Sequence, residues 1–247
     1  MRAIILVLSL LTALPVWAET PDLKDIVERH VVPRYQTLAD EATDLADAAS
    51  QDCSTESADL LTAYHDTFDA WVAVSHLRFG PSEVGDRAFA IAFWPDPRGS
   101  TPKALAALIR AEDPAVFERE EFADVSVAAR GLYALEFLLF DAQFLDAEKG
   151  DYHCALVKAL TADISANTNA ILAGWQDGYA DLMSRPGNDT YRTATEAAQQ
   201  LFTSLSTGLE FIANIRLGRP MAPSNAPGPS AQKRGDPGAP CATWSSL

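Results

Sequence analysis

The sequence predicts an all-α protein, an antiparallel helical bundle with one long ordered connection at about residues 80–103. Apolar residues recur at spacings of three and four along most of the chain, which is the period of an amphipathic helix. Strand signals are scarce, because the chain has no run of alternating β-branched residues and no Asn-Gly hairpin dipeptide. Helices with apolar stripes bury them most simply against one another, so an antiparallel bundle is expected.

The start of the chain is typical of a cleaved signal peptide over residues 1–18. Arg2 gives a short positive start, an apolar run from Ile4 to Leu14 follows, and Ala18 is a small residue at the expected cleavage position. The run is too short for a membrane span. No later segment approaches about 18 uninterrupted apolar residues. We therefore expect an exported protein with no membrane span after signal cleavage.

Five apolar stripes define the expected helices. In chain order they cover residues 23–49, 60–79, 122–145, 156–182 and 191–212. A kink is expected at Pro33 in the first, because proline lacks an amide donor, and Arg34 falls on the apolar side of this stripe. The third stripe is apolar nearly all round, which is typical of a helix in a core.

Two segments break the helical pattern. Residues 80–103 contain several turn residues and the aromatic anchors Phe93 and Trp94. Long ordered connections in compact domains are often functional. From Gly218 to Leu247 the chain has six Pro and four Gly in 30 residues and loses its apolar period, which indicates a disordered tail.

Three cysteines remain after the signal: Cys53, Cys154 and Cys241. Export favours disulfide formation, and an odd count leaves at least one cysteine unpaired or paired between chains. Cys53 follows the first expected helix and Cys154 begins the fourth. If the third helix runs parallel to the first, both lie at the same end of the bundle. A Cys53–Cys154 disulfide is therefore predicted.

The charge and the absence of common motifs narrow the function. A formal net charge of −15 argues against nucleic acid and anionic membrane surfaces as partners, and is compatible with cationic ligands or metal ions. The sequence has no His-Glu-x-x-His helix, no Gly-x-Ser-x-Gly elbow, no P-loop and no Gly-x-Gly-x-x-Gly. A conventional zinc protease is disfavoured, and a non-enzymatic role is favoured.

Three separated motifs resemble the imelysin-like family. They are the segment Arg87–Asp96, the motif Gly131–Glu136 with the apolar residues that follow it, and the segment Asn214–Pro220. Members are exported, all-helical bacterial proteins, classed by sequence with metallopeptidases and linked to iron acquisition. The resemblance covers about residues 22–220. It implies a periplasmic or envelope location and an imelysin-like helical domain at residues 19–217.

The chain departs from the family pattern in two ways. The family motif is Gly-x-His-x-x-Glu, in which His and Glu share a helix face and could bind a metal together. Tyr133 stands here at the His position. Family members also continue for about another helical half beyond the segment that ends at Pro220. The resemblance therefore implies a chain that lacks this second half.

Glu136 is the main candidate site residue, because an ionised carboxylate in an apolar helix is costly without a partner. One interpretation is a buried carboxylate bonded to Tyr133, Arg or Trp. A second, suggested by the resemblance, is a ligand or metal site whose metal is iron or another divalent ion. A third is general acid or base catalysis, for which no second catalytic group is evident.

The long connection supplies further ligand-binding candidates: Trp94, Asp96 and Arg98. Asp96 stands between two prolines, which hold it in an extended or turn geometry and present its carboxylate. The structural alternative is that Trp94 covers the bundle and Asp96 caps a helix. A pocket is expected near Glu136, Tyr133, Trp94 and Asp96.

A second candidate metal site is His65, Asp69 and His76. Their offsets of four and eleven place them within about 40° on one helix face. The alternative is a solvated flank beside the apolar stripe. His30 and His153 are interpreted as ordinary surface or interhelical residues.

The sequence thus predicts an exported binding protein for a metal ion or small ligand in iron or metal uptake. Two alternatives stay open. One is a divergent metallopeptidase of the imelysin type. The other is an envelope protein-interaction module that docks a receptor through its acidic surface.

Overall fold

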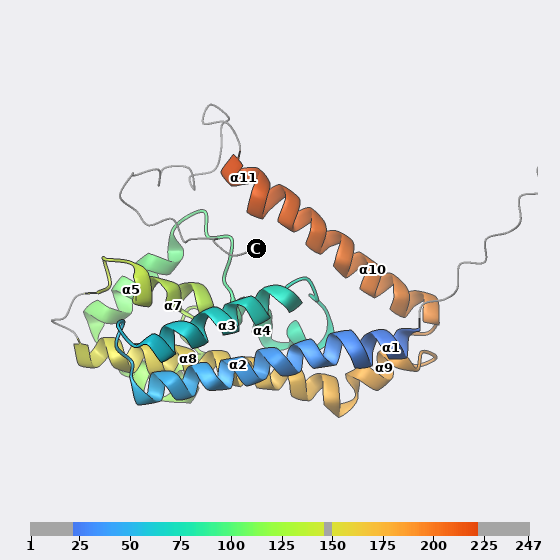
Figure 1. Ribbon diagram of the computed structural model, residues 1–247, viewed down its shortest axis with the longest axis horizontal. Coiled ribbons are helices and arrows are strands. Elements are labelled where there is room, and N and C mark those ends of the chain that lie inside the picture. Colours follow the sequence, from blue (N-terminus) through green and yellow to red (C-terminus); the bar gives the residue numbers. More distant parts are fainter. Residues whose placement is uncertain (1–21, 146–149, 222–247) are drawn as a thin grey trace, which may run out of the picture.

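The computed structural model describes residues 22–145 and 150–221, and this part of the chain is all-α (Figure 1). Its only extended pairing is an isolated bridge between Ala92 and Gly131. The all-α prediction is therefore confirmed. The expected signal peptide and the residues after 221 lie outside the described ranges. None of the helices in these ranges is long and apolar enough to cross a membrane.

The elements up to residue 91 are α1 (Leu23–Ile26), η1 (Val27–Val31), α2 (Val32–Gln51), α3 (Ala58–Val74), η2 (Gly80–Ser82), η3 (Val84–Asp86) and α4 (Arg87–Ile91). They are followed by α5 (Ser100–Ala111), η4 (Pro114–Phe117), α6 (Arg119–Ala123), η5 (Val127–Ala129) and α7 (Gly131–Phe140). The last are α8 (Gly150–Gly174), η7 (Trp175–Tyr179), α9 (Ala180–Ser184), α10 (Ala194–Phe211), η8 (Ile212–Leu217) and α11 (Gly218–Met221). Of the η elements, η1, η7 and η8 are π-helical and the others are 3-10 helices.

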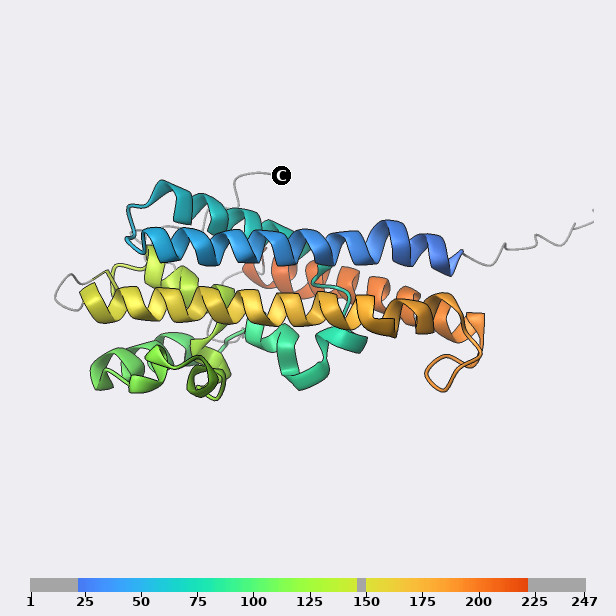
Figure 2. The ribbon, with the colours of Figure 1, turned by 90° about the horizontal axis from the view of Figure 1, so that it is seen from below.

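The long helix α2 lies between α3 and α8 and packs against both (Figure 2). It runs antiparallel to α8, as the colours in Figure 2 show. The helix α7 packs against α8 and also contacts α3 and α4. The buried side chains of these helices form one apolar core. The helix α10 runs diagonally away from the bundle towards α11 (Figure 1).

The first expected helix contains a π-helical turn, η1, directly before the α2 residues Val32 and Pro33. Backbone dihedrals stay helical through the junction, so Pro33 stands inside a continuous helix and removes one amide donor from it. Arg34 does not lie on the buried side. It is exposed, and its Nε donates to Nδ1 of His30 at 3.2 Å. Arg34 and Tyr35 follow Val31 by three and four residues, so either could share its buried face. Tyr35 is the one that is buried, because the charged side chain of Arg34 stays in water.

The third expected helix is wrong as a single element. The structure divides residues 122–145 between the end of α6, η5, α7 and an irregular segment. The break comes at Arg130, which is extended, and Gly131, which has a φ of +78°. An apolar run predicts burial, but it does not predict continuous helical dihedrals.

The long connection is ordered, but much of it is helical. Residues 80–91 form η2, η3 and α4, and α5 already begins at Ser100, inside the expected connection. Apart from the turn at Glu83, only residues 92–99 of the expected connection are irregular. None of the five expected apolar stripes covers α5, so the sequence did not predict this helix. At the other end, the last helix continues through α11 to Met221, four residues past the expected boundary at 217.

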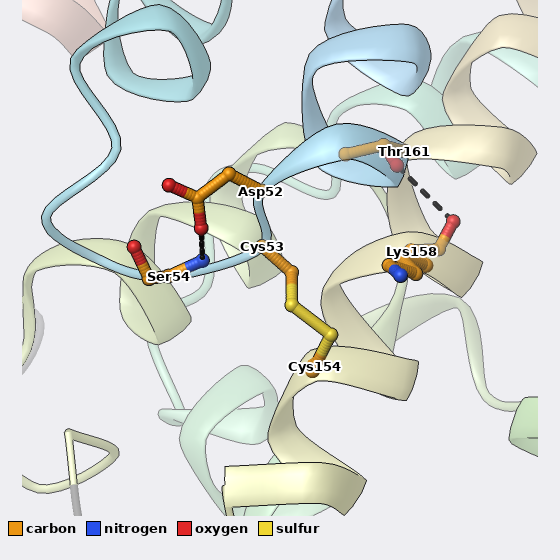
Figure 3. Close-up of a disulfide and its surroundings, with 6 residues drawn as sticks. All are labelled: Asp52, Cys53, Ser54, Cys154, Lys158 and Thr161. Carbon is orange, nitrogen blue, oxygen red and sulfur yellow. Dashed lines mark hydrogen bonds between the residues drawn. A yellow bond between two sulfur atoms is a disulfide. The ribbon is translucent and has the colours of Figure 1, made fainter.

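The Cys53–Cys154 disulfide is confirmed (Figure 3). Cys53 follows the last turn of α2, and Cys154 lies near the start of α8. Since α2 and α8 run antiparallel, these two ends meet, and the two Cα atoms are 5.3 Å apart. The bond joins positions 101 residues apart in the sequence. Cys241 lies outside the described residues.

We expect removal of this disulfide, in Cys53→Ser with Cys154→Ser, to lower the free energy of unfolding by about 3–5 kcal/mol, because the bond restricts a long loop in the unfolded chain. Urea unfolding followed by circular dichroism measures the change. Cys241→Ser is the control, since it removes a thiol and leaves the disulfide intact. Equal stability of the double variant and the wild type would contradict this prediction.

Candidate functional site

The site begins with a close backbone contact at the start of α7. A Cβ on Gly131 would lie 2.3 Å from the carbonyl oxygen of Ala90 and 2.4 Å from that of Ile91, and the φ of +78° also favours glycine. The same residue pairs with Ala92 in the isolated bridge. The contact joins the start of α7 to the segment at residues 92–99, and so brings two of the sequence motifs together.

Aromatic rings form the body of the site. The ring of Tyr133, on α7, stacks on Trp94 with centroids 6.3 Å apart and an interplanar angle of 24°. The edge of Phe68, on α3, meets Tyr133 at 5.6 Å. Phe211, the last residue of α10, meets Trp94 edge-on at 5.5 Å. These rings link three helices to the irregular segment, and Trp94 covers this end of α7.

Glu136 lies one turn beyond Tyr133 and is partly buried. Burial raises the pKa of its carboxyl above the ordinary value of 4.5. Among the described residues, no hydrogen bond or ion pair to this carboxyl is present. The expected bond from Tyr133, Arg or Trp is therefore not formed within this part of the chain. The carboxyl lies close to the phenols of Tyr64 and Tyr133. Burial raises the pKa values of both phenols, and the negative charge of Glu136 raises them further.

Arg216 brings a positive charge to the same place. Its guanidinium lies over the ring of Phe211, 5.7 Å from the centroid, and its Nε is buried with no hydrogen-bond partner among the described residues. Burial raises the pKa of Tyr133 to about 12, against the opposing charge of Arg216. Arg216 is thus close enough to Tyr133 to act on it electrostatically.

Sequence reasoning missed Arg216 as a site residue, although it lies in the third of the motifs. The signal that could have found it is its charge within that motif. Its position also depends on the π-helix η8, and π-turns are frequent at functional sites. All three motifs therefore converge on the rings of Tyr133 and Trp94.

The arrangement is suited to binding. A carboxyl, a phenol and a guanidinium border an aromatic surface, and each can give or accept a hydrogen bond to a ligand. Among the described residues, no three His, Cys, Asp or Glu side chains gather here as metal ligands. Glu136 and Tyr133 supply two oxygens, whereas protein zinc sites use three or four protein ligands.

Comparison with known proteins identifies the family. A family model described as imelysin matches residues 31–234. The chain belongs to the imelysin family. A solved structure, the crystal structure of an imelysin-like protein from Psychrobacter arcticum 273-4, has the same fold with a TM-score of 0.67 and 24% sequence identity. The similarity covers 77% of this chain and 59% of that one. No curated protein matches the sequence.

Two of the predicted ligand-binding residues of this imelysin-family protein lie apart from the rings. Asp96 caps α5, with its two carboxylate oxygens accepting the backbone amides of Ser100 and Thr101 at 2.8 Å each. Burial acts to raise the pKa of Asp96, but these hydrogen bonds outweigh it and lower the pKa below 3.8. Arg98 is exposed, and its backbone carbonyl oxygen accepts a hydrogen bond from Nζ of Lys103. The capping alternative therefore describes Asp96.

The predicted metal set of His65, Asp69 and His76 is not brought together. Eleven residues of helix extend about 16 Å, so residues on one face are still too far apart along the axis to share an ion. His76 also lies beyond the end of α3. Its ring is 6.4 Å from that of His30, whereas His65 packs against Tyr64 and Phe140. His153 is interhelical, with Nε2 3.1 Å from the carbonyl oxygen of Leu138.

We expect Gly131→Ala to lower the free energy of unfolding by more than about 2 kcal/mol, because the new methyl group meets two carbonyl oxygens and the backbone is left-handed. Gly150→Ala is the matched control. Gly150 begins α8, and a methyl group there would meet no atom within 4 Å, so this change should leave stability unchanged or raise it by up to about 1 kcal/mol. Chemical denaturation measures both. Equal effects would refute the backbone contact.

We expect Glu136→Gln to be more stable than the wild type at pH 7. The folded state raises the pKa of Glu136, so it favours the protonated carboxyl, and stability is lost as the pH rises from 4.5 through the folded pKa. The neutral amide avoids this loss. The advantage should therefore shrink as the pH falls towards 4.5 and below. Thermal unfolding of both proteins across pH 3–8 tests this, and an advantage that grows in acid would contradict it.

Proposed function

We propose that this imelysin-family protein is exported to the bacterial periplasm or cell envelope, where it binds a small ligand in iron or metal uptake and does not act as a conventional protease. One observation carries the proposal. Glu136, Tyr133 and Arg216 are brought together by three distant motifs and border the aromatic surface around Trp94. Within residues 22–145 and 150–221, the Nε of Arg216 is buried without a partner, which costs free energy unless a ligand supplies one.

The donor set suggests what form a metal would take. Two oxygens from Glu136 and Tyr133 leave a metal ion short of ligands, so the ion would have to bring others of its own. A chelate with carboxylate groups meets this need, because a carboxylate can also pair with the guanidinium of Arg216. We therefore propose a metal-bearing or acidic small molecule as the ligand, in preference to a bare ion.

The metallopeptidase alternative receives less support. A hydrolytic metal site needs about three protein ligands and an activated water. The described residues bring no such set to Glu136. Chelator-sensitive cleavage of a peptide library that disappears in Glu136→Ala would favour the peptidase over the binding protein.

Calorimetric titration tests the proposal, using Fe(III), Fe(II), Cu(II) and Zn(II), each as the bare ion and as its citrate complex. We expect one of the complexes to bind more tightly than its bare ion. Glu136→Gln and Arg216→Gln should each weaken that binding roughly ten- to hundredfold, since hydrogen bonds to charged groups contribute about 1.5–3 kcal/mol.

Glu120→Gln, an exposed residue of α6, is the control for a change of charge. It should bind as the wild type does. Equally weak binding by the wild type and Glu136→Gln, for ions and complexes alike, would refute the proposed site.

A further inference from the structure

The helix α10 has two apolar stripes. The inner stripe is Ala197, Leu201, Ser204, Gly208 and Phe211, and the outer stripe is Ala198, Phe202, Leu205, Leu209 and Ile212, the last at the first position of η8. Each outer position follows an inner one by a single residue. Because consecutive residues in a helix are about 100° apart, the two stripes face directions about 100° apart.

The inner stripe faces the bundle. The hydroxyl of Ser204 donates to the carbonyl oxygen of His76, and a Cβ on Gly208 would lie 2.5 Å from the Cβ of His76. Phe211 meets Trp94 through the edge-on ring contact at the site. Small residues in the middle of this stripe let α10 approach the end of α3 closely. The inner stripe is therefore already occupied.

The outer stripe faces solvent. Phe202 is 64% exposed, Leu205 50%, Leu209 57% and Ile212 41%. In the whole of α10, only Ala197 and Ser204 are buried, and both belong to the inner stripe. Four large apolar side chains in one row are far more than the isolated exposed residues of an ordinary surface.

The spacing of the outer stripe is that of a helix–helix seam. The steps from Ala198 to Ile212 are four, three, four and three residues, which is the alternation of heptad positions in a coiled coil. The residues on its solvent side are uncharged: Thr195, Gln199, Ser206 and Ala213. A partner helix can thus approach this seam without meeting like charge, although the chain carries a net charge of −15.

We propose that the outer stripe of α10 is the interface with a second copy of this chain, in an antiparallel two-fold pair of α10 helices. In a two-fold interface, residue i meets j and j meets i. A two-fold axis midway between Leu205 and Leu209 places Leu205 of each copy opposite Leu209 of the other. It likewise places Phe202 of each copy opposite Ile212 of the other. Every large side chain of the stripe then faces an apolar one.

The size of the seam sets the strength of the dimer. Fifteen residues of helix are about 22 Å long, and a single pair of such helices buries less than the roughly 1,200 Å² at which stable interfaces begin. Interfaces of this size are typical of weak, transient encounters, so the dimer is reversible, and about 1–100 μM is the concentration range in which we look for it.

Sedimentation velocity of the full chain across this range of concentrations tests the proposal. The wild type shifts from monomer to dimer as concentration rises. Leu205→Glu with Leu209→Glu stays monomeric at every concentration, because the charges would lie buried and unpaired at the seam. Thr203→Glu with Thr207→Glu adds the same charge to exposed positions of α10 that face away from the seam, and keeps the dimer. Circular dichroism verifies that each variant is helical.

Disulfide trapping tests the register with smaller changes. In a Cys241→Ser background, a mixture of Phe202→Cys and Ile212→Cys proteins forms an intermolecular disulfide on mild oxidation, whereas either protein alone does not. A mixture of Thr203→Cys and Ile212→Cys is the control and stays uncrosslinked. A wild type that is monomeric throughout, or a dimer that survives the two glutamates, overturns the proposal. The stripe would then be covered by residues after 221 or by a different polypeptide.

Discussion

The close approach of Gly131 to the carbonyl oxygens of Ala90 and Ile91 is the constraint on which the rest of the site depends. A side chain at this position would separate α7 from the segment that follows α4. Without the contact, Trp94 could not stack on Tyr133, and the ring of Phe211 would lose the partner that holds the end of α10. One missing methyl group therefore allows three distant parts of the chain to meet.

Polar groups at the site differ from those elsewhere in the molecule. Arg130 and Asp163 are also buried, but they form a bidentate ion pair with N–O distances of 2.7 and 3.0 Å. Asp96 is satisfied by two backbone amides. Among the described residues, Glu136 has neither kind of partner, and the Nε of Arg216 is buried and unpaired. The Nε1 of Trp175, in the core, is also buried and unpaired there, so it is the contrast with the paired charges of Arg130, Asp163 and Asp96 that supports a binding role for the site.

The helix that carries Phe211 and leads into η8 buries few of its residues against the bundle, namely Ala197 and Ser204. Its inner stripe is narrow and built partly of small residues, while its outer stripe holds the bulkier side chains. Burial of the outer stripe would hold α10 more firmly, and with it the π-turn that positions Arg216. One helix and the π-turn that follows it thus support both the proposed interface and the proposed site.

The sequence by itself determined the all-α class, the pairing of Cys53 with Cys154 and the family, because apolar period, cysteine placement and motif order are local properties of the chain. Tertiary structure alone decided which polar residues meet. Residue spacing cannot decide whether Arg34 or Tyr35 is buried on a shared helix face. It also placed His65 and His76 on one face, although these residues are far apart along the helix axis. It also could not find Arg216, because a π-turn and a glycine contact between distant segments bring that residue to Tyr133.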